Sequence, residues 1–353
     1  MRLFECDSCG NLVYFENTRC EQCGADLAFN PDHLRLSVRP PQARPCDNAR
    51  HDACNWLLAA DAAADEIFCP ACRLNRTIPD LSTPGALALW QRVEIAKHRA
   101  VYGLLRLGLT LPNRVDEPET GLAFDFLADP DPTFREVMTG HAAGLITLNI
   151  VEADPVERER QRTTMGEPFR TLLGHLRHEL GHYLWDRLLA PDAARLADWR
   201  QQFGDERDDY AAALDRHYAA DDDGGWRDAF VSHYAAAHPW EDWAESCAHY
   251  LHMVDTLETA WAFGLRSRPR RGPPEVATAA DFDPYAEPDF DRIVEAWLPL
   301  TFAVNSLNRS MGQPDLYPFV VAPPAMDKLR HVHRVLRGVS GGCAGGGGKG
   351  CCG

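Results

Sequence analysis

The stretch His178-Glu179-Leu180-Gly181-His182 decides how the rest of the sequence is interpreted, and it lies within a helical pattern over residues 168–189. Two histidines four residues apart lie one above the other on a helix face, so both imidazoles can reach one metal ion. Glu179 projects into the same cleft, where a carboxylate can take a proton from a metal-activated water. The sequence therefore predicts an open, catalytic zinc site with His178 and His182 as ligands and Glu179 as general base.

The surroundings of this motif support a buried cleft. Gly181 leaves room for another backbone to pass close to the metal. Residues 144–151 precede the helix and are predicted to form an edge strand that can pair with an extended peptide. The opposite side of the helix is apolar and consists of Phe169, Leu172, Leu173, Leu176, Leu180, Tyr183 and Leu184.

A third ligand must come from a later helix, which is predicted over residues 241–263. Glu241, Glu245 and His249 follow one another at intervals of four and share a face of this helix. If Glu241 binds zinc, Glu245 can accept the free N–H of a liganding histidine and fix its ring. If Glu245 is the ligand, His249 is the supporting group, and imidazole accepts less well than carboxylate. The spacing favours Glu241 and leaves Glu245 as the alternative.

These two helices resemble those of the gluzincin metallopeptidases, and in particular the protease domain of anthrax lethal factor. The resemblance rests on His178–His182 and on Glu241-x-x-Ala244-Glu245. It implies a zincin-like fold, Glu241 as ligand and Glu245 in contact with a liganding histidine. It also implies a tyrosine, seven residues before the ligand glutamate, that steadies the oxyanion. Tyr234 has this offset, and three other side chains compete for the role: Tyr218, His233 and Tyr250.

The first four cysteines predict a zinc ribbon. They form two Cys-x-x-Cys pairs, each followed by glycine, which is typical of a tetrahedral four-thiolate site: Cys6, Cys9, Cys20 and Cys23. Residues 12–15 between them are predicted to form a strand. Two disulfides are the alternative, and a reducing cytosol disfavours them. Over about residues 1–335 the chain is similar to a bacterial family of zinc-binding metallopeptidases with an N-terminal zinc ribbon.

The next four cysteines predict a second structural zinc: Cys46, Cys54, Cys69 and Cys72. His51 lies within the first spacing and is an alternative to Cys46 or Cys54. Closed four-ligand sites stabilise small domains and leave no position for chemistry. The expected cofactors are therefore one catalytic and two structural Zn²⁺ ions.

The remaining cysteines are not expected to be catalytic. Cys247 lies in a helical pattern, where a small buried apolar role is expected. The other three lie in a glycine-rich segment, residues 338–353, that is predicted to be a disordered tail: Cys343, Cys351 and Cys352.

Strand and helix patterns predict an α+β protein. Residues 121–127 and 144–151 are predicted to be strands, 153–164 a charged loop, and helices follow. The expected domains are zinc modules over 1–80 and a mainly helical zincin-like domain with a small sheet over 84–337. Helices are predicted over 86–107, 168–189, 194–220, 226–238, 241–263, 290–308 and 325–337.

Composition limits the partners. The chain has 353 residues, with 36 Lys+Arg against 52 Asp+Glu and a formal charge of −16. This excess of acid argues against a general nucleic-acid binder. No apolar run is long enough to span a membrane, and the N-terminus lacks a signal-peptide pattern, so a cytoplasmic protein is expected.

The sequence thus predicts a zinc metallopeptidase with a peptide or protein substrate, and with the ribbon as a site for a protein partner. One rival is an interaction or regulatory protein whose metal site is not catalytic, and the presence of Glu179 speaks against it. The other is a nucleic-acid-associated protein that uses the basic residues 266–271 and 328–337, for which solvated faces are the ordinary explanation.

Overall fold

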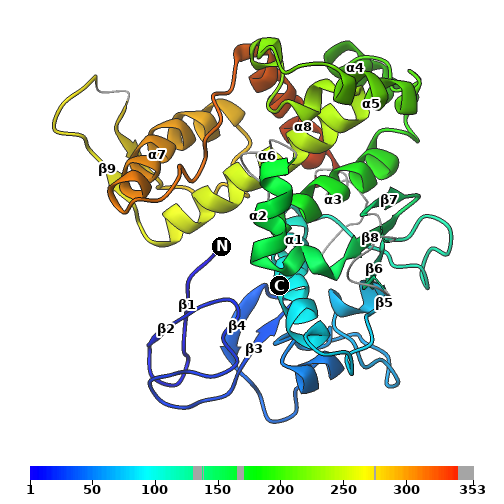
Figure 1. Cartoon of the computed structure of the whole chain (residues 1–353). Coiled ribbons are helices and arrows are strands. Elements are labelled where there is room, and N and C mark those ends of the chain that lie inside the picture. Colours follow the sequence, from blue (N-terminus) through cyan, green and yellow to red (C-terminus); the bar gives the residue numbers. More distant parts are fainter. Residues whose placement is uncertain (130–136, 138, 165–170, 274–275, 341–353) are drawn as a thin grey trace, which may run out of the picture.

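The computed structural model describes residues 1–129, 137, 139–164, 171–273 and 276–340, with the backbone alone at 161–164 and 339–340. Phe169, the cysteines of the tail and residues 341–353 lie outside these ranges. Figure 1 shows short blue strands below helix α1 (Ala86–Arg106), a small sheet on the right and helix α7 (Phe290–Ser310) on the left. The predicted α+β class is confirmed, because short strands and a small sheet precede a mainly helical region.

The largest sheet has the strand order β5-β6-β8-β7 within the described residues. Its strands are β5 (Asn75–Thr77), β6 (Ala123–Leu127), β7 (Gly140–Ala142) and β8 (Leu145–Asn149). β5, β6 and β8 are parallel to one another, and β7 is antiparallel to β8.

The prediction that residues 144–151 form an edge strand is wrong, because β8 lies between β6 and β7. A tight turn causes this arrangement. Ala143 (φ 46°) and Gly144 (φ 83°) both have left-handed backbone conformations, which suit a two-residue hairpin turn. The turn folds β7 against β8 and leaves β7, rather than β8, at the edge of the sheet.

Helices and short 3-10 turns make up most of the chain after the sheet. No helix of the described ranges is both long and apolar enough to cross a membrane. The elements are η3 (Ile150–Ala153), α2 (Pro155–Thr164), α3 (Leu172–Leu188), α4 (Ala193–Phe203), α5 (Tyr210–Ala219), η4 (Gly225–Asp228), η5 (Tyr234–Ala236), α6 (Pro239–Ala262), β9 (Arg266–Ser267), β10 (Thr278–Ala279), α7 and α8 (Pro323–Ser340).

Three segments differ from the predictions, each for a local reason. The predicted loop 153–164 contains α2, whose first turn is capped by Asp154 and begins at a proline. The predicted helix 194–220 is two helices, because Gly204 (φ 105°) ends α4 and Asp209 caps α5. The predicted helix 226–238 is two short turns, and the extended His238 before Pro239 separates it from α6.

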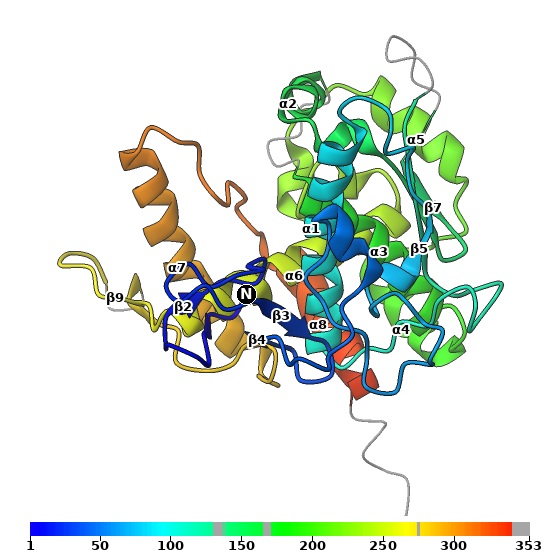
Figure 2. The ribbon, with the colours of Figure 1, turned by 90° about the horizontal axis from the view of Figure 1, so that it is seen from below.

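The region of the predicted zinc modules, residues 1–80, is called the front module and, apart from β5, consists of small hairpins and turns. Figure 2, seen from below, shows it beside α1 and α6, and the Arg2 guanidinium lies 5.7 Å from the ring of Trp261 in α6. Its elements are β1 (Phe4–Glu5), β2 (Leu12–Val13), β3 (Leu27–Asn30), β4 (Arg35–Val38), η1 (Asp47–His51) and η2 (Cys72–Leu74).

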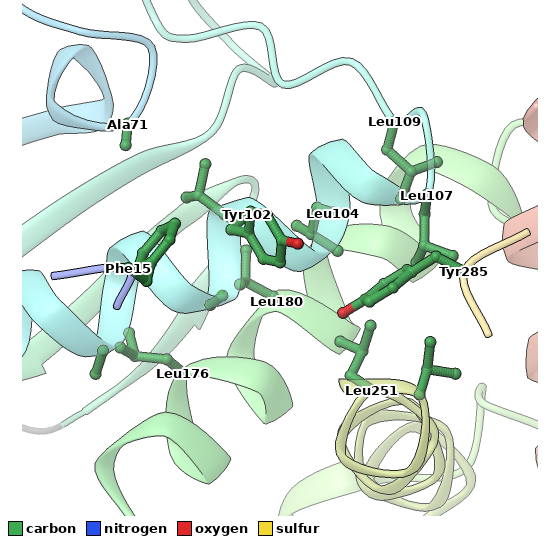
Figure 3. Packing of buried hydrophobic residues seen from close by; sticks show 14 of the residues in the cluster. Phe15, Ala71, Tyr102, Leu104, Leu107, Leu109, Leu176, Leu180, Leu251 and Tyr285 are labelled. Atoms are coloured by element: carbon green, nitrogen blue, oxygen red, sulfur yellow. The ribbon is translucent and has the colours of Figure 1, made fainter. Parts of the chain in front are cut away.

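Aromatic packing joins this module to the helices. The ring of Phe15 lies 4.9 Å from that of Phe29 and 5.2 Å from that of Tyr102 in α1. Figure 3 shows the continuation of the same core toward Leu176 and Leu180 of α3. The buried cluster is therefore continuous from the front module to the helix that carries the histidine motif.

Helices α3 and α6 approach each other closely at Gly181. A Cβ at this position would lie 2.9 Å from the Cα of Ala244. The indole Nε1 of Trp243 donates to the carbonyl of Gly181 at 2.9 Å. Cys247 is fully buried at the same contact, as expected of a small core residue. The absence of a side chain at Gly181 thus lets the two motif helices meet.

Candidate functional site

Helix α3 positions the histidine pair. The hydroxyl of Thr171 accepts a hydrogen bond from the Gly174 amide (2.9 Å) and caps the first turn of the helix. The Nε2 atoms of His178 and His182, one turn apart, lie 3.2 Å from each other. Both residues are buried, with 8% and 4% of their surfaces exposed. The pair therefore faces the interior and not solvent.

Helix α6 brings Glu241 to this pair. Its Oε2 lies 3.0 Å from Nε2 of His178 and 3.5 Å from Nε2 of His182. Atoms bound tetrahedrally to zinc at about 2.0–2.1 Å lie about 3.3 Å apart, and the measured separations bracket that value. Oε2 of Glu241 is buried without a hydrogen-bond partner, which a metal ion would supply. These three side chains fit a zinc ion.

Glu245 supports the pair from the other side of the His178 ring. Its Oε1 accepts from Nδ1 of His178 at 2.8 Å, and its Oε2 accepts from the hydroxyl of Ser232 at 2.5 Å. Burial opposes its ionisation, yet the hydrogen bond from His178 lowers the pKa of Glu245 to about 2. His249 instead pairs through Nδ1 with the hydroxyl of Tyr317 (2.7 Å). Glu241 thus faces Nε2 of His178, and Glu245 faces Nδ1 of the same ring.

Glu179 lies next to the three candidate ligands but does not converge with them. Its Oε1 is 3.3 Å from Nε2 of His175, and only 5% of the residue is exposed. Burial opposes its ionisation, but the hydrogen bond from His175 and the neighbouring imidazoles lower the pKa of Glu179 below its ordinary value. The group is therefore a carboxylate that can accept a proton.

Two tyrosines lie next to the candidate ligands. The ring of Tyr234, from η5, lies 5.8 Å from the ring of His178. The hydroxyl of Tyr210, from α5, donates to Oε1 of Glu241 at 2.8 Å. The side chains that compete with Tyr234 in the sequence have other surroundings. Tyr250 pairs with His333 (3.0 Å), the ring of His233 lies 4.2 Å from that of His217, and Tyr218 is 68% exposed.

One wall of the site is aromatic. The ring of Trp240 lies 4.0 Å from that of His182. The ring of His141, from the edge strand β7, lies 6.0 Å from that of His182. Because His141 belongs to β7, the edge of the sheet runs beside the histidine pair.

The first cysteine set forms one compact cluster. The sulfurs of Cys6 and Cys23, and those of Cys9 and Cys20, are 3.7 Å apart. Thiolates about 2.3 Å from one ion in a tetrahedron lie about 3.8 Å apart, whereas a disulfide holds its sulfurs at about 2.0 Å. The arrangement fits zinc, and these cysteines form no disulfide.

The second cysteine set lies against helix α1. The sulfurs of Cys54 and Cys69 are 3.7 Å apart, and Cys46 and Cys72 complete the cluster. Nε2 of His98, from α1, lies 3.3 Å from the sulfur of Cys54. The alternative candidate His51 lies elsewhere, with its Nε2 3.0 Å from Nε of Arg50.

Sequence reasoning did not identify five polar side chains described at these sites: His98, His141, His175, Tyr210 and Ser232. His175 stands four residues before Glu179, so helix periodicity could have placed it on the same face. His98 lies on the predicted helix 86–107, but no motif links it to the cysteines. Tyr210 and Ser232 come from segments in which the predicted helices are broken, so no pattern could have placed them.

Two family models match the chain. Residues 86–335 match the family described as "Putative zinc-binding metallo-peptidase", and residues 3–83 match one described as "zinc-ribbon domain". The chain is similar to "Uncharacterized protein Rv2568c" of Mycobacterium tuberculosis and to "Uncharacterized protein Mb2598c" of Mycobacterium bovis. Each is 42% identical over 340 residues, which cover 95% of this chain and 95% of the relative.

No solved structure matches the chain, and the likeness to the lethal-factor protease stays a prediction. The wider family resemblance is confirmed, since the first match spans most of the chain and the second covers the cysteine modules. The chain therefore belongs to the family of zinc-binding metallopeptidases that carry an N-terminal zinc ribbon.

Proposed function

We propose that this protein hydrolyses peptide bonds at a zinc centre held by His178, His182 and Glu241. The observation that carries the proposal is the convergence of Nε2, Nε2 and Oε2 within 3.5 Å of one another, beside a carboxylate, Glu179, that is not one of the three. A purely structural site needs the ligands but no additional base.

The chain's own residues have distinct roles in this reaction. A zinc ion held by the three ligands would supply Lewis-acid chemistry, polarising the substrate carbonyl and making water more acidic. Glu179 accepts the proton of the attacking water and returns it to the leaving amine. Glu245 orients the ring of His178 through Nδ1. Tyr234 donates to the oxyanion as negative charge develops on it.

An extended peptide is the substrate that the surroundings favour. β7 is an edge strand within the described sheet, and it places His141 next to His182. A peptide that pairs with such an edge forms main-chain hydrogen bonds along its length. Its scissile bond would then lie over the histidine pair.

The front modules have a supporting role in the proposal. Two zinc ions bound by the cysteine sets would stabilise residues 1–80 against α1 and the domain over 84–337, and the exposed part of the ribbon would receive a protein partner. Thiolate sites of this kind need reduced cysteines, which fits the cytoplasm.

The test combines metal analysis with hydrolysis of a quenched fluorescent peptide library. We expect about three zinc ions per chain for wild type and for Glu179→Gln. Hydrolysis should be about 10²–10⁴-fold slower in Glu179→Gln, because the general base is lost. Glu295→Gln is the matched control, since Glu295 is exposed on α7 and lies far from Glu179 in the sequence. This variant should behave as wild type.

Equal turnover by wild type and Glu179→Gln would refute the proposed mechanism. Wild type that holds the third zinc but cleaves no peptide would favour the rival function, an interaction or regulatory protein. Glu241→Ala should lose one zinc, and retention of all three would move the third-ligand assignment to Glu245.

A further inference from the structure

A row of three polar side chains leads away from the metal centre and is not explained by metal binding. Nε2 of His175 lies 3.3 Å from Oε1 of Glu179, and Nδ1 of His175 lies 2.6 Å from Oε2 of Glu152. His175 and Glu179 are one turn apart on α3, whereas Glu152 belongs to η3, directly after β8. One imidazole thus bridges two carboxylates from different elements.

The far end of this row is fixed. Glu152 is 7% exposed, and its Oε1 accepts a hydrogen bond from the hydroxyl of Thr139. The carbonyl of Glu152 also accepts from Nη1 of Arg158 in α2 at 3.0 Å. A buried carboxylate held by these contacts can fix the orientation of the ring that donates to it.

The near end of the row meets the proposed base. Glutamate has three rotatable side-chain bonds, and a general base must lie within hydrogen-bond reach of the proton that it accepts. The contact between Nε2 of His175 and Oε1 of Glu179, at 3.3 Å, restricts these rotations. His175 itself is not in the ligand set, since the atoms that converge belong to His178, His182 and Glu241.

We infer that His175, anchored by Glu152, is a positioning residue that holds the carboxylate of Glu179 in the orientation required of the base. This inference rests on the proposed function, because Glu179 is a base only in an active peptidase. The row links the end of strand β8 to the catalytic helix, so the base is oriented from outside its own helix.

The test compares His175→Ala, Glu152→Ala and the double variant with wild type on the best peptide of the library. We expect full zinc content, an unchanged KM and a kcat lowered about 10–100-fold in each single variant. The double variant should be no slower than the slower single variant, because both residues act through one contact. His175→Gln, which retains a donor, should recover part of the lost kcat.

His333→Ala is the matched control. His333 is buried in α8 and also has two ring contacts, with the hydroxyl of Tyr250 (3.0 Å) and the carbonyl of Pro288 (2.9 Å). Its replacement should lower stability without the selective effect on kcat. An equal loss of kcat in His333→Ala would overturn the inference, since the effect would then be a general loss of packing.

A second measurement does not depend on turnover. In protein labelled with ¹⁵N-histidine, the imidazole resonances of His175, assigned by their absence in His175→Ala, should shift in Glu152→Ala and in Glu179→Gln but not in Glu295→Gln. If the His175 resonances shift in neither glutamate variant, the proposed link from Glu152 through His175 to Glu179 is wrong. The inference would also be overturned if His175→Ala kept the wild-type kcat or lost a zinc ion.

Failure of the two proposals is distinguishable. If wild type cleaves peptides no faster than Glu179→Gln, the proposed function fails and the inference fails with it. If wild type is active and only the His175 and Glu152 variants are indistinguishable from it, the inference alone fails.

Discussion

The contact between α3 and α6 at Gly181 gives the sharpest prediction, because it links core packing to metal affinity. Gly181→Ala places a Cβ 2.9 Å from the Cα of Ala244 and 3.1 Å from its carbonyl oxygen. Carbon atoms in favourable contact are about 3.5–4.0 Å apart. A local separation of the helices by about 0.6 Å would restore a favourable contact.

This separation acts directly on the ligand set. Glu241 lies three residues before Ala244 on α6, so a retreat of α6 carries its carboxylate away from the histidine pair. Ligand distances in a metal site are held to about ±0.2 Å, which is smaller than the required shift. We therefore expect zinc affinity at this site to fall by at least about tenfold.

Stability should fall by less than the steric clash alone suggests. Overpacking of this kind costs about 1–3 kcal/mol, and the helix preference of alanine over glycine offsets about 0.5–1 kcal/mol of it. The expected net decrease in the free energy of unfolding is about 0–2.5 kcal/mol.

The assay is a chelator competition for the most weakly held zinc, together with denaturant unfolding. Gly338→Ala is the matched control, because a Cβ at Gly338 in α8 meets no atom within 4 Å. It should leave zinc affinity unchanged and not reduce stability. Gly181→Ala with wild-type zinc affinity and wild-type stability would refute the reasoning that close backbone contact sets the ligand geometry.

Two further predictions concern charge. Glu245→Ala removes the acceptor of the His178 N–H and should weaken zinc binding about 10–100-fold by chelator competition, and an unchanged affinity would contradict the supporting role. His331 faces Asp198 and Arg334, and burial lowers the pKa of its imidazole to about 4. Between about pH 6.5 and 4 the unfolded chain therefore binds more protons than the folded chain, and stability is lost as the pH falls through this range. His331→Asn should reduce the stability difference between pH 7 and pH 5 by on the order of 1–2 kcal/mol in denaturant unfolding, and identical pH dependence would count against this account.

The fold was predictable where local patterns are strong. The helical periodicity over residues 86–107 and 241–263 predicted α1 and α6 to within a few residues. The predictions failed where a single backbone feature controls the outcome, as with Gly204 between α4 and α5, or the turn at Ala143 and Gly144 that places β7 at the edge. Such features change the direction of the chain without changing the periodicity of the hydrophobic residues.

The spacing of two histidines on a helix and of paired cysteines is a local property, so the sequence alone could predict which side chains would form metal sites. It also narrowed the choice of third zinc ligand to Glu241 or Glu245, which lie on one face of the same helix. The packing of α6 against α3 places Glu241, and not Glu245, at Nε2 of His178, and the folded chain brings Tyr210, Ser232 and Glu152 to the site. These contacts depend on how separate elements pack, as α3 does against α6 at Gly181, and the distance between two packed elements is not encoded in either segment alone.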